Sequence, residues 1–175
     1  IIEHQTKLKT LDLGEGDLAS NCYPVNSQLL NLICEQTQLE ELSIGFNLDV
    51  TPGDVNQLRK LKNLKQLLLQ TSFFDFEVNS EVLEAFANTK IPSLKSLRLE
   101  ANVADMTQQF MRTMGESFPY LEEYIGDFNI HERDNELSTF NVFLYAFPHL
   151  TTLELLESHY EFIPGRIYPN MKKLN

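Results

Sequence analysis

Apolar residues recur along this chain in a fixed pattern of the form Leu-x-x-Leu-x-Leu, in which x is most often polar. Six copies and a truncated seventh begin at the following residues: Leu8, Leu39, Leu64, Leu94, Leu121, Leu150 and Met171. The copy that begins at Leu121 is degenerate, with Tyr124 and Gly126 at its second and third apolar places. The mean interval between copies is about 27 residues, a period that predicts an array of similar stacked units.

Most copies alternate apolar and polar residues over their second half, which predicts a short strand with one face in the core. Four copies are preceded by an apolar residue, a proline and one further residue, and these prolines are Pro92, Pro119, Pro148 and Pro169. Proline ends a preceding helix and keeps the residue before it extended. The pattern therefore predicts that a helix ends just before each of these strands.

Between the strands the apolar residues change to helical spacing. The predicted helical stripes are Leu29, Leu30, Leu32 and Ile33; Val55, Leu58 and Leu61; Val82, Leu83 and Phe86; Phe110, Met111 and Met114; and Leu137, Phe140, Phe143, Leu144 and Phe147. Thr51 followed by Pro52 and Asp54 is typical of a helix start, with Thr51 as N-cap. We also expect Asp105 and Gln108 to form a capping box.

Taken together, these elements predict an α/β solenoid of about six repeats over residues 1–175. The parallel β-sheet is expected on a concave face and the helices on a convex face, with a leucine core shared between units. A helical bundle is the alternative, but leucines at i, i+3 and i+5 make no helical stripe and the prolines would break such helices. Neither end carries a polar capping unit, so we expect a segment of a longer protein.

Charge narrows the choice of partner. The 175 residues include 14 Lys and Arg against 25 Asp and Glu, a formal net charge of −11. Nucleic acid and anionic membrane surfaces would repel such a chain, so we expect neither as a partner. No apolar run approaches the roughly 18 residues that span a bilayer. A protein or peptide, favourably a basic one, is the expected partner.

Cysteine usage and glycosylation sequons favour a cytoplasmic or nuclear location. The two cysteines, Cys22 and Cys34, form neither a disulfide framework nor a Cys-x-x-Cys zinc pair. None of the asparagines stands in an Asn-x-Ser/Thr sequon.

No catalytic motif such as His-Glu-x-x-His, Gly-x-Ser-x-Gly or a P-loop is present. The histidines (His4, His131, His149 and His159) lack a second ligand at metal spacing. We therefore expect no enzyme activity, no cofactor and no metal. A pocket with clustered carboxylates of shifted pKa would favour the alternative, an enzyme with an unfamiliar site.

The polar places of each strand are expected to point to the concave face, since the apolar ones point into the core. The residues predicted to bind a partner there are Asp12, Glu41, Leu68, Arg98, Glu100, Glu123, Ile125, Asp127, Glu154 and Leu156. The three apolar residues of this set are candidate anchors of a binding patch, if exposed. Arg98 has two interpretations, a surface ion pair with Glu100 or Glu123, or a contact to a bound carboxylate or phosphate. The alternative to a binding face is a solvated acidic surface.

These copies resemble the leucine-rich repeat family over essentially the whole chain, and their length is similar to the ribonuclease-inhibitor-like subclass. The Phe-Pro-x-Leu spacing is most similar to F-box leucine-rich-repeat proteins. One departure is that Asn or Ser stands where a common F-box subtype has Cys: at Asn47, Ser72, Asn102, Asn129 and Ser158. No F-box is visible.

This resemblance implies a non-catalytic substrate-recognition domain of an F-box-type ubiquitin ligase, with an adaptor contact only if an F-box lies outside this segment. The alternative is a sensor or scaffold domain of a nucleotide-binding immune-type receptor or other cytosolic adaptor.

Overall fold

The computed structural model describes residues 7–13, 24–46, 49–70, 80–100, 107–126, 142–155 and 173–174. Its strands are β1 (Thr10–Asp12), β2 (Pro24–Val25), β3 (Glu41–Phe46), β4 (Gln66–Gln70), β5 (Ser96–Glu100), β6 (Glu123–Gly126), β7 (Thr152–Leu155) and β8 (Lys173–Leu174). Its helices are α1 (Ser27–Cys34), α2 (Pro52–Val55), α3 (Ser80–Ala87) and α4 (Gln108–Ser117), with a 3₁₀ helix, η2 (Asn56–Lys60), directly after α2. Residues 142–146 are also helical.

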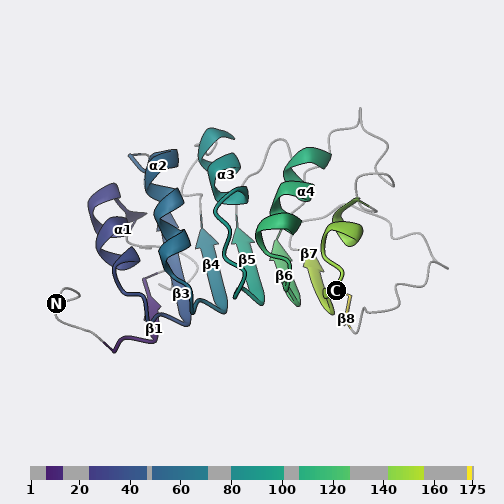
Figure 1. Cartoon of the computed structure of the whole chain (residues 1–175), viewed down its shortest axis with the longest axis horizontal. Coiled ribbons are helices and arrows are strands. Elements are labelled where there is room, and N and C mark those ends of the chain that lie inside the picture. The colour runs from purple at the N-terminus through teal and green to yellow at the C-terminus, as the bar shows by residue number, and fades with distance from the viewer. Residues whose placement is uncertain are drawn as a thin grey trace.

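The strands form one sheet in the order β1-β3-β4-β5-β6-β7-β8, and every neighbouring pair is parallel. The helices lie side by side in a second layer along the sheet (Figure 1). Parallel neighbours need a crossover connection, and here the helices lie on those connections. The prediction of an α/β architecture with a parallel sheet is confirmed.

The second apolar places of the copies form one row across the sheet, in which each strand, or rung, contributes one residue. The residues aligned there by strand pairing are Leu11, Leu42, Leu67, Leu97, Tyr124, Leu153 and Leu174. The register predicted from the sequence is therefore confirmed, and the truncated seventh copy contributes β8. The bundle interpretation is wrong, because these residues form strands.

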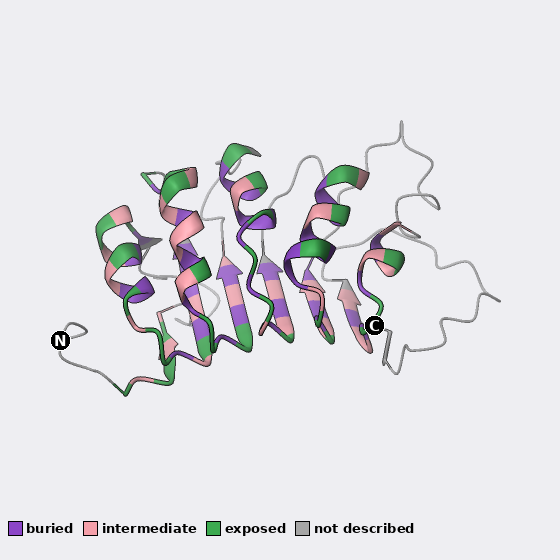
Figure 2. Cartoon of the chain, viewed as in Figure 1, coloured by how far each residue is buried: buried purple, intermediate pink, exposed green. Residues whose placement is uncertain are grey.

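The core lies between the sheet and the helices. Along β4 to β6 buried residues alternate with more exposed ones, as Figure 2 shows. The first leucine of each copy is buried as well, and Leu39, Leu64, Leu94 and Leu121 are each 0% exposed. Full burial of one leucine side chain contributes about 1.5–3 kcal/mol, so the repeated leucines supply much of the folding free energy.

The predicted helix start at Thr51 is confirmed. The Thr51 hydroxyl accepts the backbone N–H of Asp54, and the Asp54 carboxylate accepts the backbone N–H of Thr51 at 2.9 Å. Only one turn is α-helical, and the stripe continues as η2. The predicted capping box of Asp105 and Gln108 before α4 is wrong. The N-cap is Thr107, whose hydroxyl accepts the N–H of Phe110 at 3.1 Å. Asp105 lies outside the described residues.

One strand has no counterpart in the sequence pattern. β2 pairs with the second half of β3, with Pro24 beside Gly45 and Val25 beside Phe46. β1 pairs with the first half of the same edge of β3. Two residues carry no readable periodicity, so β2 could not be predicted from alternation.

The degenerate copy, which begins at Leu121, keeps the same strand register although Tyr124 is larger and Gly126 smaller than the aliphatic residues at these places in the other full copies. Tyr124 is 0% exposed, and its ring packs edge-on against Phe143 with ring centroids 5.1 Å apart. A Cβ added at Gly126 would lie 2.9 Å from the Tyr124 hydroxyl and 2.5 Å from the carbonyl oxygen of Leu99. The large ring thus occupies the space that a third leucine fills elsewhere, and glycine is required beside it.

Candidate partner-binding face

The sheet has a face that points away from the helix layer, which we call the open face. Its residues alternate along each strand with the core residues and form rows across the strands, because the register is continuous. The first row is Thr10, Glu41, Gln66, Ser96, Glu123, Thr152 and Lys173. The second row is Asp12, Ser43, Leu68, Arg98, Ile125 and Glu154. A shorter third row is Gly45, Gln70 and Glu100.

Eight of the ten residues predicted to bind a partner lie in these rows: Asp12, Glu41, Leu68, Arg98, Glu100, Glu123, Ile125 and Glu154. The other two, Asp127 and Leu156, lie outside the described residues. The structure therefore brings together residues that are more than a hundred positions apart in the chain.

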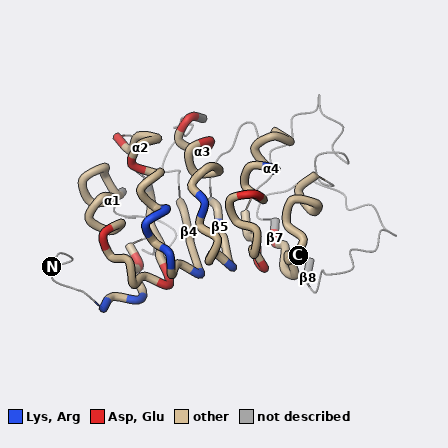
Figure 3. Tube along the Cα trace, in the orientation of Figure 1, with Lys and Arg blue, Asp and Glu red and all other residues tan. Residues whose placement is uncertain are grey.

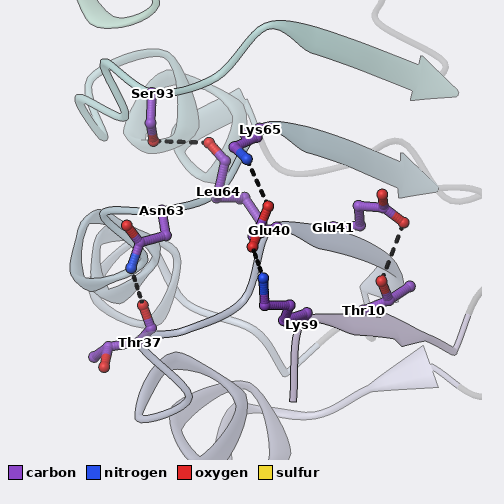
Figure 4. Close-up of polar contacts among 9 residues, drawn as sticks. All are labelled: Lys9, Thr10, Thr37, Glu40, Glu41, Asn63, Leu64, Lys65 and Ser93. Atoms are coloured by element: carbon purple, nitrogen blue, oxygen red, sulfur yellow. Dashed lines mark hydrogen bonds and ion pairs between the residues drawn. The ribbon is translucent and has the colours of Figure 1, made fainter. Parts of the chain in front are cut away.

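Hydroxyl groups hold two carboxylates of the first row in place. Thr10 Oγ1 donates to Glu41 Oε2 at 3.1 Å, and Ser96 Oγ donates to Glu123 Oε2 at 2.6 Å. Both bonds join adjacent strands, and the first is drawn in Figure 4. A carboxylate that already has a fixed direction loses less conformational entropy when it binds a cation.

The centre of the second row combines one guanidinium with two aliphatic side chains. Arg98 stands beside Leu68 on one strand and Ile125 on the other. All three are half-buried rather than fully exposed, which changes the expectation of exposed anchors. Half-buried apolar neighbours exclude water and strengthen the interaction of a charge with an incoming group.

A ladder of charges runs along the edge where the strands begin, at the second place of the first five copies: Lys9, Glu40, Lys65, Lys95 and Glu122. Glu40 accepts from Lys9 at 2.6 Å and from Lys65 at 2.5 Å, and Lys95 contacts Glu122 at 2.6 Å. Basic and acidic positions lie next to one another along this edge (Figures 3 and 4). Hydrogen bonds from Lys65 and Lys9 lower the pKa of Glu40 to about 2. This ladder was not predicted from the sequence. The signal for it is that Lys or Glu recurs at the second place of the copies.

Backbone and side-chain bonds fix the spacing between copies. The carbonyl oxygen of Glu40 accepts the N–H groups of both Lys65 and Gln66 in the next copy, at 2.7 and 3.0 Å. Two side chains add bonds to preceding carbonyls (Figure 4): Asn63 Nδ2 donates to Thr37 O at 2.9 Å, and Ser93 Oγ donates to Leu64 O at 2.7 Å. The rows of the open face are thus held at a fixed separation before any partner arrives.

Asp54 is a second carboxylate with a shifted pKa, on the helix side of the molecule. Hydroxyl donors at Ser27 and Thr51, each 2.6 Å from Oδ2, lower its pKa to about 2. The amide of Asn31 donates to the other oxygen at 3.1 Å. Since Ser27 and Asn31 belong to α1, this network joins α1 to the start of α2 and is structural.

A shallow groove of about 490 Å³ lies on the helix side between α4 and the helix 142–146. The two helices approach closely here, since a Cβ added at Gly115 would lie 2.4 Å from the carbonyl oxygen of Ala146. Tyr145 lines the groove with 85% of its surface exposed. None of the residues predicted to bind a partner lines this groove.

Cys34, the last residue of α1, is the one cysteine whose position is described, and it is buried. Burial raises the pKa of its thiol to about 12, which favours the protonated form over the nucleophilic thiolate. Among the described residues, no group of three or more His, Cys, Asp or Glu side chains could hold a metal ion. Within the same residues, no helix has the length and apolar character to cross a membrane.

No protein-family model matches the sequence, and no curated protein is significantly similar to it. A solved structure similar to the chain is the tropomodulin C-terminal domain from structural genomics of Caenorhabditis elegans. The TM-score is 0.50 at 14% sequence identity, covering 85% of this chain and 87% of that chain. At this identity the similarity supports the fold alone, which is an α/β repeat fold like that of a leucine-rich-repeat domain.

Proposed function

We propose that the chain is a slice of a leucine-rich-repeat horseshoe of about six repeats, and that it acts without catalysis as a protein-interaction domain. The open face would be the concave surface, and it would bind a protein or peptide that presents Lys or Arg. The location that fits this role is cytoplasmic or nuclear.

The observation that carries the proposal is the second row. Six side chains from six strands, from Asp12 to Glu154, stand in continuous register on a sheet face that no described helix covers. Its centre holds Leu68, Arg98 and Ile125, residues of the kinds that form a water-excluding centre and an anchoring cation in protein interfaces.

Charge supports a basic partner. Among the described side chains of the open face, the acidic ones are Asp12, Glu41, Glu123 and Glu154, against one basic side chain, Arg98. The net charge of −11 attracts a cationic partner at long range and raises the rate of association.

The test is a fourfold charge reversal of the open face, with Asp12, Glu41, Glu123 and Glu154 each changed to Lys. We expect this variant to lose at least about tenfold in affinity for the partner captured by the full protein, since each acidic contact becomes repulsive. The measurement is isothermal titration calorimetry with the purified partner.

The matched control reverses four acidic residues on the helix side: Asp49, Glu81, Glu84 and Glu116. All four are exposed, and the change in net charge is the same. Equal loss in both variants would mean that total charge, rather than the open face, governs binding. Unchanged affinity in the open-face variant would contradict the proposed site.

The resemblance to F-box proteins suggests a more specific role, recruitment of substrates to a ubiquitin ligase. A sensor or scaffold domain is the alternative from the same resemblance. Co-purification of the complete parent protein with an F-box adaptor would favour the first, and a nucleotide-binding module in the parent would favour the second.

A further inference from the structure

The second row changes chemistry at each rung in a defined order. From β1 to β7 it reads acidic, hydroxyl, aliphatic, basic, aliphatic, acidic, as Asp12, Ser43, Leu68, Arg98, Ile125 and Glu154. A partner that satisfies the whole row must therefore present a different side chain about every 4.8 Å, the spacing of neighbouring strands.

From this spacing we infer that the occupant of the open face is an amphipathic α-helix lying across the strands, with an acidic residue over Arg98 and basic residues over Asp12 and Glu154. The inference rests on the proposed function, because it names the partner of the same face. It goes further by fixing the partner's secondary structure and the order of its charges.

The pitch of the helix is the first argument. An α-helix brings a side chain back to the same face once per turn, about every 5.4 Å, so it drifts from the rung spacing by about 0.6 Å per step and by about 3 Å over the five steps of the row, less than one rung. An extended strand presents same-face side chains about every 6.7 Å, so it would be out of step by more than one rung within four residues of one face. A polyproline helix repeats about every 9.3 Å and would contact alternate rungs only.

The order of charges is the second argument, and it sets the sequence of the helix. One turn to either side of the acidic residue, three or four positions away, lie the aliphatic contacts for Leu68 and Ile125. Two turns toward β7, about seven positions away, lies a basic residue for Glu154. Three turns toward β1, about eleven positions away, lies a second basic residue for Asp12, after a small residue over Ser43.

The rigidity of the face is the third argument. The spacing of the rungs is fixed by paired backbone bonds such as those from Lys65 and Gln66 to the carbonyl of Glu40. Asn63 and Ser93 add side-chain bonds to preceding carbonyls on the same side of the rungs. A face with fixed spacing can discriminate between ligands of different repeat length, because it does not adjust to a mismatch.

The test uses a fluorescent synthetic helix of about 22 residues, built on alanine and glutamine, that carries Glu, two Leu and two Lys at the positions above. One control peptide has the same composition with the charged residues moved by two positions, which places them on the opposite side of the helix. A second control places proline at every third position. Fluorescence anisotropy with the full 175-residue chain measures each affinity.

We expect the matched helix to bind at least about tenfold more tightly than either control, a difference of about 1.4 kcal/mol. Arg98→Glu should abolish this preference, and a peptide with Arg in place of its central Glu should restore it. Glu154→Lys, paired with Glu at the corresponding peptide position, repeats the exchange at a site nearer the sheet edge, in case Arg98→Glu disturbs folding. Circular dichroism of both variants checks that they fold.

Equal affinity for the matched and shifted helices, or tighter binding of the proline peptide, would overturn the inference. So would absence of binding by all three peptides. In each of these cases the proposed function is decided separately, by whether the fourfold open-face variant loses its natural partner.

Discussion

Two parts of the sheet solve the same packing problem in different ways. We call β3, β4 and β5 the leucine rungs. We call β6 and β7 the aromatic rungs because of Tyr124 and of Phe143 and Phe147 on the segment between them, although β7 itself contributes Leu153 to the core. In the leucine rungs two leucines, or a leucine and an isoleucine, fill each strand's share of the core, as Leu67 and Leu69 do at 2% and 1% exposure. In the aromatic rungs Tyr124 packs against Phe143, whose ring lies 4.8 Å from that of Phe147.

The contacts between copies differ in the same way. Directly before the first leucine of the copy, β4 has Asn63 and β5 has Ser93, which donate hydrogen bonds to preceding carbonyls, whereas β3 has Gln38. The aromatic rungs have Tyr120 and His149 at this place, and their rings lie 5.7 Å apart. A repeat therefore constrains geometry and volume rather than residue identity, since either chemistry maintains the same strand register.

The largest expected effect tests the paired change at Tyr124 and Gly126. Gly126→Ala should destabilise the protein by about 3 kcal/mol, because the added Cβ meets the backbone oxygen of Leu99 and the tyrosine ring. Urea unfolding followed by circular dichroism measures the change. The control is Gly53→Ala, whose added Cβ would meet only Thr51 Oγ1 at an ordinary 3.6 Å. Similar losses in both variants would contradict the paired-change explanation.

Tyr124→Leu restores the leucine pattern of the other rungs and should still destabilise the protein by about 2 kcal/mol. The smaller side chain leaves a cavity over Gly126 and removes the ring contact with Phe143. The same urea titration measures it. An unchanged or increased stability would show that the tyrosine is a departure from the pattern without a packing role.

The hydrogen bonds between leucine rungs are expected to contribute less. Ser93→Ala should cost about 1 kcal/mol, since its hydroxyl donates to a carbonyl in a half-buried position, and Asn63→Ala should cost less because Asn63 is exposed. Gln38→Ala is the control, at the same repeat place but with no hydrogen bond shown for its side chain among the described residues. If Gln38→Ala lowered the unfolding free energy as much as Ser93→Ala, the hydrogen bonds between copies would not be the cause of the loss.

The smallest expected effect on stability is that of Glu40, and it changes only at acidic pH. The pKa of Glu40 falls from 4.5 to about 2 in the folded chain, so its ion pairs stabilise the fold above pH 4.5 and the contribution is lost as pH falls toward 2. Glu40→Gln should therefore weaken the pH dependence of the unfolding free energy between these values, with salt reducing the difference. Urea midpoints across that range measure it, and identical slopes in the two proteins would contradict the prediction.

Much of the fold could be predicted because leucine spacing is a local property with one consistent structural solution. The register from Leu11 to Leu153 and the helix start at Thr51 both follow from residues a few positions apart. β2 could not be predicted, because a two-residue strand depends on the edge of β3 and carries no pattern of its own. The cap at Thr107 was missed because Asp105 and Thr107 have similar capping propensity, and only the path of the chain selects between them.

For the candidate site, alternation alone assigned residues such as Glu41 and Glu123 to one face of the sheet. Their hydroxyl partners Thr10 and Ser96 were not foreseen, since each bond joins two copies. The sequence also left open whether Leu68 and Ile125 would be exposed, and they are half-buried.

By itself, the sequence determined which residues face the core and which strands are neighbours, because the hydrophobic periodicity and the repeat length are properties of the order of residues alone. Only the tertiary structure decided how the copies are joined, through Glu40 between Lys9 and Lys65, and why position 126, beside Tyr124, requires glycine. These features depend on distances between residues about 25 to 30 positions apart, and such distances exist only once the units are stacked.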